Sequence, residues 1–133
     1  MRYLLDTNII TEILKENEKV IKKAQTVRIE GKEILINAIS YYEVKRGLLS
    51  TNATKQLEKF EQLCKIFGLT LLDTQNIFDI ASLIYKDLKQ KGKIIEDADI
   101  LIASISLNGN FILISADNDF NRIKNLRVEN WLV

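Results

Sequence analysis

Tyr3-Leu4-Leu5-Asp6-Thr7-Asn8 is the stretch that decides the fold, because an apolar run ends there on a carboxylate. The apolar residues predict a strand over residues 2–5, and the isoleucines that follow predict a helix. In a parallel sheet wrapped by helices, ligands sit at the carboxyl ends of the strands. Asp6 is therefore expected where such a fold binds its ligand, although its side chain could equally serve only to cap the following helix.

Three more acids adjoin apolar segments in the same way. They are Glu43 after residues 40–42, Asp99 before residues 100–103, and Asp117 after residues 112–116. Carboxylates gathered at one edge of a sheet repel one another and raise each other's pKa, so such a cluster persists mainly by binding a divalent cation. The sequence thus predicts a metal site built from Asp6, Glu43, Asp99 and Asp117.

Glu43 and Asp99 also have plainer interpretations. Glu43 stands three residues after Ser40, which is the spacing of a capping box at the start of a helix. Asp99 follows Glu96 and Asp97, where a helix dipole favours negative charge. Asp99 differs from these neighbours because it shares the buried face of its helix with Ala103, and an unpaired carboxylate there is costly.

Strand and helix patterns alternate along the chain. Strands are expected at residues 2–5, 33–39, 69–72, 111–115 and 127–131. Helices are expected through residues 9–14, at 18–26, 40–49 and 54–67, through 77–88, and at 97–107. One helical turn is expected at residues 118–123. This alternation predicts a three-layer α/β/α fold with a central parallel sheet. The 133 residues, 47% of them hydrophobic, have the size of a single domain spanning residues 1–133.

Composition excludes several classes of protein. The chain has no histidine, which removes Ser-His-Asp and Cys-His catalysis and histidine zinc sites. Its one cysteine, Cys64, cannot form an internal disulfide, no basic and apolar leader precedes Asp6, and no apolar run is long enough to cross a membrane, so we expect a cytoplasmic protein. The net charge of +1 gives no overall signal for nucleic acid, but lysines and arginines in 15–32, 45–46 and 86–93 could flank a polyanion or could be solvated helix faces.

Taken together, these segments resemble the motifs of the PIN-domain ribonucleases, and most closely those of the VapC-type toxins of prokaryotic toxin–antitoxin pairs. The resemblance covers nearly the whole chain. Its motifs are Leu4–Asn8, Ile39–Gly47, Asp99–Ser104, Leu113–Phe120 with Ser115 where threonine is usual, and the ending Leu126–Trp131. Each motif alone is weak, and the order of all of them in so short a chain makes the resemblance specific.

The resemblance implies a PIN-like fold and a metal-dependent endoribonuclease. Asp6, Glu43, Asp99 and Asp117 would be the catalytic, metal-binding acids, with Asp119 competing for the fourth role and Thr7, Asn8 and Ser115 as supporting residues. The cofactor would be Mg²⁺ or Mn²⁺, activating a water that cleaves single-stranded or loop RNA. A small antitoxin protein would be the partner, and homodimers are usual in the family.

Two rival functions remain open at this stage. One is a PIN nuclease that processes RNA or acts on DNA without any antitoxin. The other is a non-catalytic module with an acidic pocket, such as a receiver domain of a response regulator. A receiver needs an acidic pair near the first strand and a lysine after the fifth; here Asp6 stands alone and no lysine follows Ile114 until Lys124.

Overall fold

A central parallel sheet organises the computed structural model, which describes residues 1–70 and 75–133. Its strands are β1 (Arg2–Leu5), β2 (Glu33–Asn37), β3 (Leu69–Thr70), β4 (Ile112–Ile114) and β5 (Val128–Glu129). They lie in the order β3-β2-β1-β4-β5, and every neighbouring pair is parallel. The predicted parallel sheet is confirmed.

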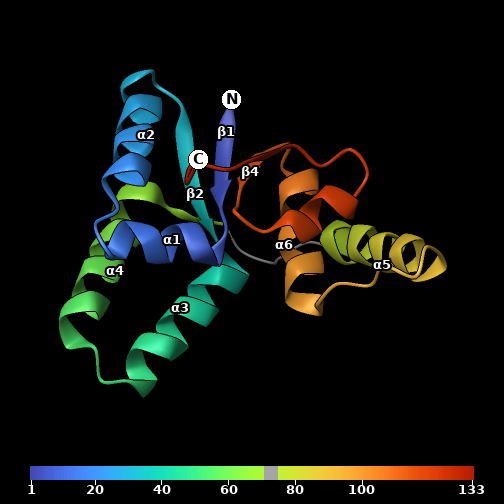
Figure 1. The fold of residues 1–133 in the computed structure, drawn as a ribbon, viewed down its shortest axis with the longest axis horizontal. Coiled ribbons are helices and arrows are strands. Elements are labelled where there is room, and N and C mark those ends of the chain that lie inside the picture. Colours follow the sequence, from blue (N-terminus) through green and yellow to red (C-terminus); the bar gives the residue numbers. More distant parts are fainter. Residues whose placement is uncertain (71–74) are drawn as a thin grey trace.

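Helices cover both faces of this sheet (Figure 1). On one face lie α1 (Thr7–Leu14), α2 (Glu18–Ile29), α3 (Ala38–Ser50) and α4 (Thr54–Phe67), and on the other α5 (Gln75–Gln90) and α6 (Asp97–Asn108). A short 3₁₀ helix, η1 (Asn118–Arg122), follows β4. This is the three-layer α/β/α fold expected from the sequence. None of the helices in the described residues is long and apolar enough to cross a membrane.

After Arg2, which is exposed, the central strand β1 is apolar because both of its faces are covered. Tyr3 and Leu5 point into the core formed with α1 to α4, whereas Leu4 points into the core formed with α5 and α6. Leu4 is in register with Leu35 of β2 and Leu113 of β4, which face the same side. Side chains alternate along a strand, so a run without polar residues is what two covered faces require.

The difference from the predicted elements that bears on the site lies between β2 and α3; the helix predicted at 18–26 also runs three residues further, to Ile29. The sequence predicts a strand to Ile39 and a helix from Ser40, but β2 ends at Asn37 and α3 begins at Ala38. The cause is the Asn37 side chain, whose Oδ1 accepts a hydrogen bond from the Ser40 backbone N at 2.8 Å and so caps the helix. The strand predicted at 69–72 is seen as Leu69–Thr70, and residues 71 and 72 lie outside the described residues.

The strand order places a crevice beside β1. From β1 the chain moves outward through β2 and β3, then crosses to β4 and β5 on the other side. After β1 the chain enters α1 in one core, and after β4 it enters η1 in the other. In α/β folds, ligands bind in the crevice at such a switch point. Asp6 directly follows β1, and its backbone N donates to the Ile114 carbonyl at 2.9 Å. Asp117 follows β4 at the same edge of the sheet.

Candidate active site

Four acidic side chains from distant parts of the chain line one open cleft of about 480 Å³ at this edge of the sheet. The residues around it are Asp6, Thr7, Asn8, Thr11, Glu12, Lys15, Glu43, Asp99 and Asp117. The structure therefore brings together all four acids that the sequence marks as candidate metal ligands. Asp119 is not among the lining residues, and its carboxylate instead pairs with Arg122 at 3.3 Å. Of the two competing acids, Asp117 is the one in the cleft.

Asp6 is held between two elements. Its Oδ1 accepts from the Thr7 backbone N at 2.8 Å, and its Oδ2 accepts from the Ser115 hydroxyl at 2.7 Å. Both Asp6 and Ser115 are buried. Asp6 thus caps α1, as one interpretation of the sequence expects, while it also lines the cleft. The bond from Ser115 to Asp6 ties the carboxyl ends of β1 and β4 together, and the Ser115 hydroxyl oxygen also accepts from the Asp117 backbone N at 3.0 Å.

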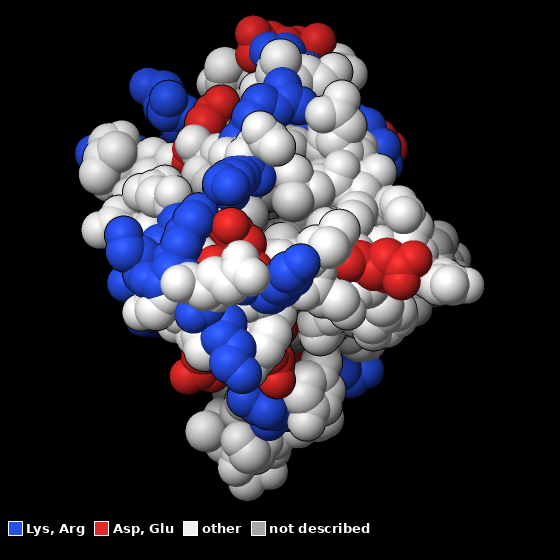
Figure 2. Space-filling view, turned by 90° about the vertical axis from the view of Figure 1, so that its right-hand side faces the viewer, with Lys and Arg blue, Asp and Glu red and all other residues white. Residues whose placement is uncertain are grey.

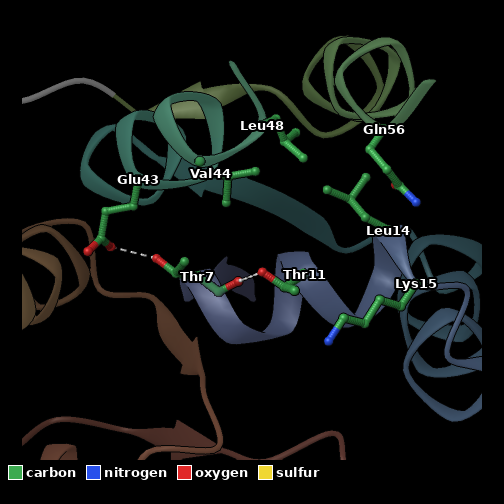
Figure 3. A pocket seen from close by; sticks show the side chains of 9 residues that line it. Thr7, Thr11, Leu14, Lys15, Glu43, Val44, Leu48 and Gln56 are labelled. Atoms are coloured by element: carbon green, nitrogen blue, oxygen red, sulfur yellow. Dashed lines mark hydrogen bonds between the residues drawn. The ribbon is translucent and has the colours of Figure 1, made fainter. Parts of the chain in front are cut away.

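Glu43 is not part of a capping box. The helix start predicted at Ser40, which puts Glu43 in the first turn, is wrong: α3 begins at Ala38, so Glu43 lies beyond the first turn and Asn37 is the cap. The alternative of a capping box formed by Ser40 and Glu43 is therefore excluded. Its Oε1 instead accepts from the Thr7 hydroxyl at 2.7 Å. That bond crosses from α1 to α3 and turns the carboxylate toward the cleft (Figure 3).

A buried polar network behind Glu43 escapes the sequence analysis. Asn37 and Ser40 are fully buried, and Asn37 Nδ2 donates both to the Leu5 carbonyl at 2.8 Å and to the Ser40 hydroxyl at 2.9 Å. The Ser40 and Thr7 hydroxyl oxygens are 2.9 Å apart. Since the single Thr7 hydroxyl hydrogen serves Glu43, the Ser40 hydroxyl donates to Thr7. A signal for this network exists in the sequence: Asn37 interrupts an apolar strand one strand away from Asp6.

Asp99 and Asp117 complete the cleft from the other side. Asp99 lies in the first turn of α6, as expected, and accepts no hydrogen bond from any residue that the structure describes. Asp117 accepts from the Asp119 backbone N at 2.9 Å and so begins η1. Asn8 accepts from the Ala116 backbone N at 3.4 Å, which links α1 to the segment before Asp117.

The acids raise one another's proton affinity. Burial, and then repulsion by Asp6, Asp117 and Glu43, raises the pKa of Asp99 to about 6 from the ordinary 3.8. The pKa of Asp6 is raised by burial, against the lowering effect of its bonds from Ser115 and Thr7, with a further rise from Glu43 and Asp117. The raised pKa values show that the carboxylates repel one another, and a bound cation would relieve this repulsion.

The donors of this cleft fit a hard divalent cation. They are carboxylate oxygens, and the chain has no histidine to favour zinc. Among the described residues, no three acidic or cysteine side chains stand close enough to enclose an ion by themselves. An open set of this kind suits Mg²⁺ or Mn²⁺, because Mg²⁺ usually keeps several waters and takes only one or two protein carboxylates.

An apolar groove of about 310 Å³ adjoins the acidic cleft between α1, α3 and α4 (Figure 3). Its apolar lining comes from Leu14, Val44 and Leu48. The groove and the cleft share Thr7, Thr11, Lys15 and Glu43, so these side chains form the border between them.

Other basic side chains lie outside the cleft. Figure 2 shows lysines and arginines in a band over the side of the molecule that carries α5 and α6. Some of them are paired: Asp87 of α5 accepts from Lys91 at 2.9 Å and lies 3.5 Å from Lys124. Exposed pairs of this kind contribute little to stability. This part of the surface agrees with the interpretation of solvated helix faces.

The family model of the PIN domain matches residues 3–126. The chain belongs to the PIN-domain family, as its motifs predict. Ribonuclease VapC2 of Rickettsia felis is 29% identical over 136 residues, covering 98% of each chain. The structure of VapBC-1 from nontypeable Haemophilus influenzae contains a chain that is 26% identical, with a TM-score of 0.88 and complete coverage of both chains. A chain of VapBC2 from Rickettsia felis, bound to a DNA fragment from their promoter, is 26% identical with a TM-score of 0.86, covering 98% of this chain and 99% of that one.

Proposed function

We propose that this protein is a Mg²⁺- or Mn²⁺-dependent endoribonuclease and the toxin of a toxin–antitoxin pair. One observation carries the proposal: four carboxylates from four distant segments line a single cleft at the carboxyl ends of β1 and β4. The names of the relatives, Ribonuclease VapC, support the reaction class. Their complexes, named VapBC, support a protein partner.

In this reaction the residues of the protein would bind the metal ion and orient it toward the substrate. Glu43, Asp99 and Asp117 present oxygens to the cleft, and Asp6 is fixed by Ser115 and Thr7 at the base of the set. A bound Mg²⁺ or Mn²⁺ would supply positive charge for the transferring phosphoryl group and lower the pKa of an attacking water. The Asn37–Ser40–Thr7 network keeps Glu43 aimed at the cleft, so less ordering is needed when substrate binds.

Cleavage of single-stranded RNA tests the activity. The wild-type protein should cut RNA internally with Mg²⁺ or Mn²⁺, stop on addition of EDTA, and lose at least about 100-fold in rate when Asp6 or Asp99 is replaced by alanine. Single-stranded DNA of the same sequence is the matched substrate. Preference for DNA would favour the alternative of a PIN nuclease on DNA. Absence of both cleavage and Mn²⁺ binding would favour the non-catalytic module.

A growth assay distinguishes the toxin function from the alternative of a nuclease that processes RNA. Expression of the wild-type protein alone should arrest growth, expression of the Asp99→Ala variant should not, and co-expression of the small protein encoded next to it should restore growth. RNA cleavage without growth arrest would favour a PIN nuclease in RNA processing. The toxin function places the protein in the cytoplasm, where its RNA substrate and its partner are made.

We also propose that the protein forms a homodimer through the side that carries α5 and α6. Phe78 is 49% exposed and Tyr85 40% exposed, and both line a cleft with Ile100 and Leu101 between the two helices. Large exposed apolar side chains gathered in one place mark protein interfaces. Light scattering of the wild type and of Phe78→Glu tests this, because only the wild type should have the mass of a dimer.

A further inference from the structure

One edge of α1 forms a ridge between the acidic cleft and the apolar groove. Thr7, Thr11 and Lys15 follow one another at intervals of four residues, so they share a face of the helix. All three line both the cleft and the groove. In Figure 3 the ammonium end of Lys15 points back along α1 toward Thr11, and therefore toward the carboxylates.

Lys15 is a cation without a carboxylate partner among the described residues. It is absent from every ion pair in this part of the chain, although five acids line the same cleft. Its backbone is fixed, since the Lys15 N donates to the Thr11 carbonyl at 3.0 Å and ends α1. An exposed lysine held at the rim of a carboxylate cleft, and not paired to it, remains available to an anion that arrives from solvent.

The chemistry of the proposed substrate fits this position. RNA is a polyanion, and the carboxylates of the cleft repel its phosphates unless positive charge lies nearby. Lys15 is nine residues beyond Asp6, which is about 13 Å along the axis of a helix. The lysine side chain points back by part of that distance. Its ammonium group therefore stands clear of the reacting centre and within reach of a strand that passes over it.

We infer that Lys15 binds the backbone of the RNA substrate at a phosphate neighbouring the scissile one. The strand runs along the ridge of α1 from the acidic cleft past Thr7 and Thr11 to Lys15. This inference rests on the proposed nuclease function and adds to it the direction in which the substrate leaves the cleft. Lys15 is a substrate-binding residue in this arrangement and takes no part in the chemical step.

Binding of a random-sequence, fluorescein-labelled single-stranded RNA, followed by anisotropy in Mn²⁺ buffer, tests the inference. Asp99→Asn is introduced in every protein to prevent cleavage. Lys15→Ala should weaken binding by about 3–10-fold at low salt and reduce the slope of log K against log salt by about 0.7, the value of one phosphate contact to a single strand. Lys15→Arg should bind like the parent protein. Lys22→Ala, at an exposed lysine of α2 outside both pockets, is the matched control.

Mn²⁺ titration of the same lysine variants, with Asp99 intact, excludes an indirect effect. If Lys15 acted by neutralising the carboxylates, its removal would change Mn²⁺ affinity as well as RNA binding, and that result would overturn the inference. An unchanged salt slope in Lys15→Ala would overturn it too, with the nuclease function left standing. If neither the parent protein nor the wild type held in EDTA bound RNA, although the wild type bound Mn²⁺ and cleaved no RNA, the proposed function would fail and the inference with it.

Discussion

Thr7 is the residue on which the placement of Glu43 depends. Its hydroxyl donates to Glu43 at 2.7 Å and is the end point of the buried chain from Asn37 through Ser40. We expect Thr7→Val, which keeps the shape and removes the hydroxyl, to weaken Mn²⁺ binding about 10-fold or more, because partners that orient metal ligands typically contribute that much. Calorimetric titration with Mn²⁺ measures the change.

Thr11→Val is the matched control for this prediction. Thr11 lines the same cleft one turn along α1, but its hydroxyl donates to the Thr7 backbone carbonyl and touches no acid. Its loss should leave Mn²⁺ affinity nearly unchanged. Equal effects of the two substitutions would mean that Thr7 matters only as part of α1, and not through Glu43.

Asp99 should make the metal-free protein less stable as the pH rises. Its pKa in the folded protein is about 6, against 3.8 ordinarily, so the folded state binds its proton more tightly than the unfolded state does. The contribution of the Asp99 carboxyl to the free energy of unfolding is therefore fully present below pH 3.8 and is lost as the pH rises through 6. In EDTA, the melting temperature of wild type relative to Asp99→Asn should fall between about pH 4 and about pH 6.5, the interval set by the two pKa values. Parallel curves would show that Asp99 ionises normally.

The four cleft acids could be predicted from the sequence because each adjoins an apolar segment whose end must reach the same edge of a parallel sheet. The choice between Asp117 and Asp119 could not, since two residues of spacing do not say which side chain turns inward. In the structure, Asp119 pairs with Arg122 outside the cleft, whereas Asp117 lines the cleft. Asn37 and Ser40 were missed because the one signal, a polar Asn37 in an apolar run, does not identify the partners of its side chain.

At the scale of elements, Asn37 sets the boundary between β2 and α3. Its side chain caps α3 through Ser40 N and also donates to the Leu5 carbonyl at the end of β1. We expect Asn37→Ala to lower the free energy of unfolding by about 2–4 kcal/mol, because it removes a cap and leaves buried groups unpaired. Urea denaturation measures this.

The Asn17 cap of α2 provides the comparison. Asn17 accepts from the backbone N of Lys19 and of Val20 at a more exposed helix start. Asn17→Ala should cost only about 1 kcal/mol, because water can replace the lost acceptor. If both variants lost the same amount, the bond from Asn37 to β1 would contribute nothing beyond capping.

Element types were predictable because helices and strands have different apolar periods, but their ends depended on capping that composition does not reveal. The helix at 54–67 was predicted with both ends correct, since Gly68 follows it with a φ of +83°, a conformation that favours glycine. The predicted end of β2 lay two residues too far along the chain, because Ala38 and Ile39 continue the apolar pattern into α3. Apolar residues fit either element there.

At the scale of the whole molecule, the strand order could not be obtained from the sequence. The alternation of strands and helices requires parallel strands, but several orders satisfy it. The order β3-β2-β1-β4-β5 puts β1 at the centre, where Leu4 and Leu5 are both fully buried on opposite faces. One strand therefore joins the core formed with α1 to α4 to the core formed with α5 and α6.

Because the two cores share β1, β2 and β4, we propose that residues 1–133 unfold as one domain. Leu88 of α5 is fully buried in the core with α6, whereas Trp131, the only tryptophan, is buried in the opposite core against Tyr3. Leu88→Ala should lower stability by about 2–5 kcal/mol. The loss should be the same whether unfolding is followed by Trp131 fluorescence or by far-ultraviolet circular dichroism, since a two-state transition is seen alike by every probe. A fluorescence midpoint that stays at its wild-type value while the dichroism midpoint shifts would mean that α5 and α6 unfold on their own, and that the sheet does not couple its two faces.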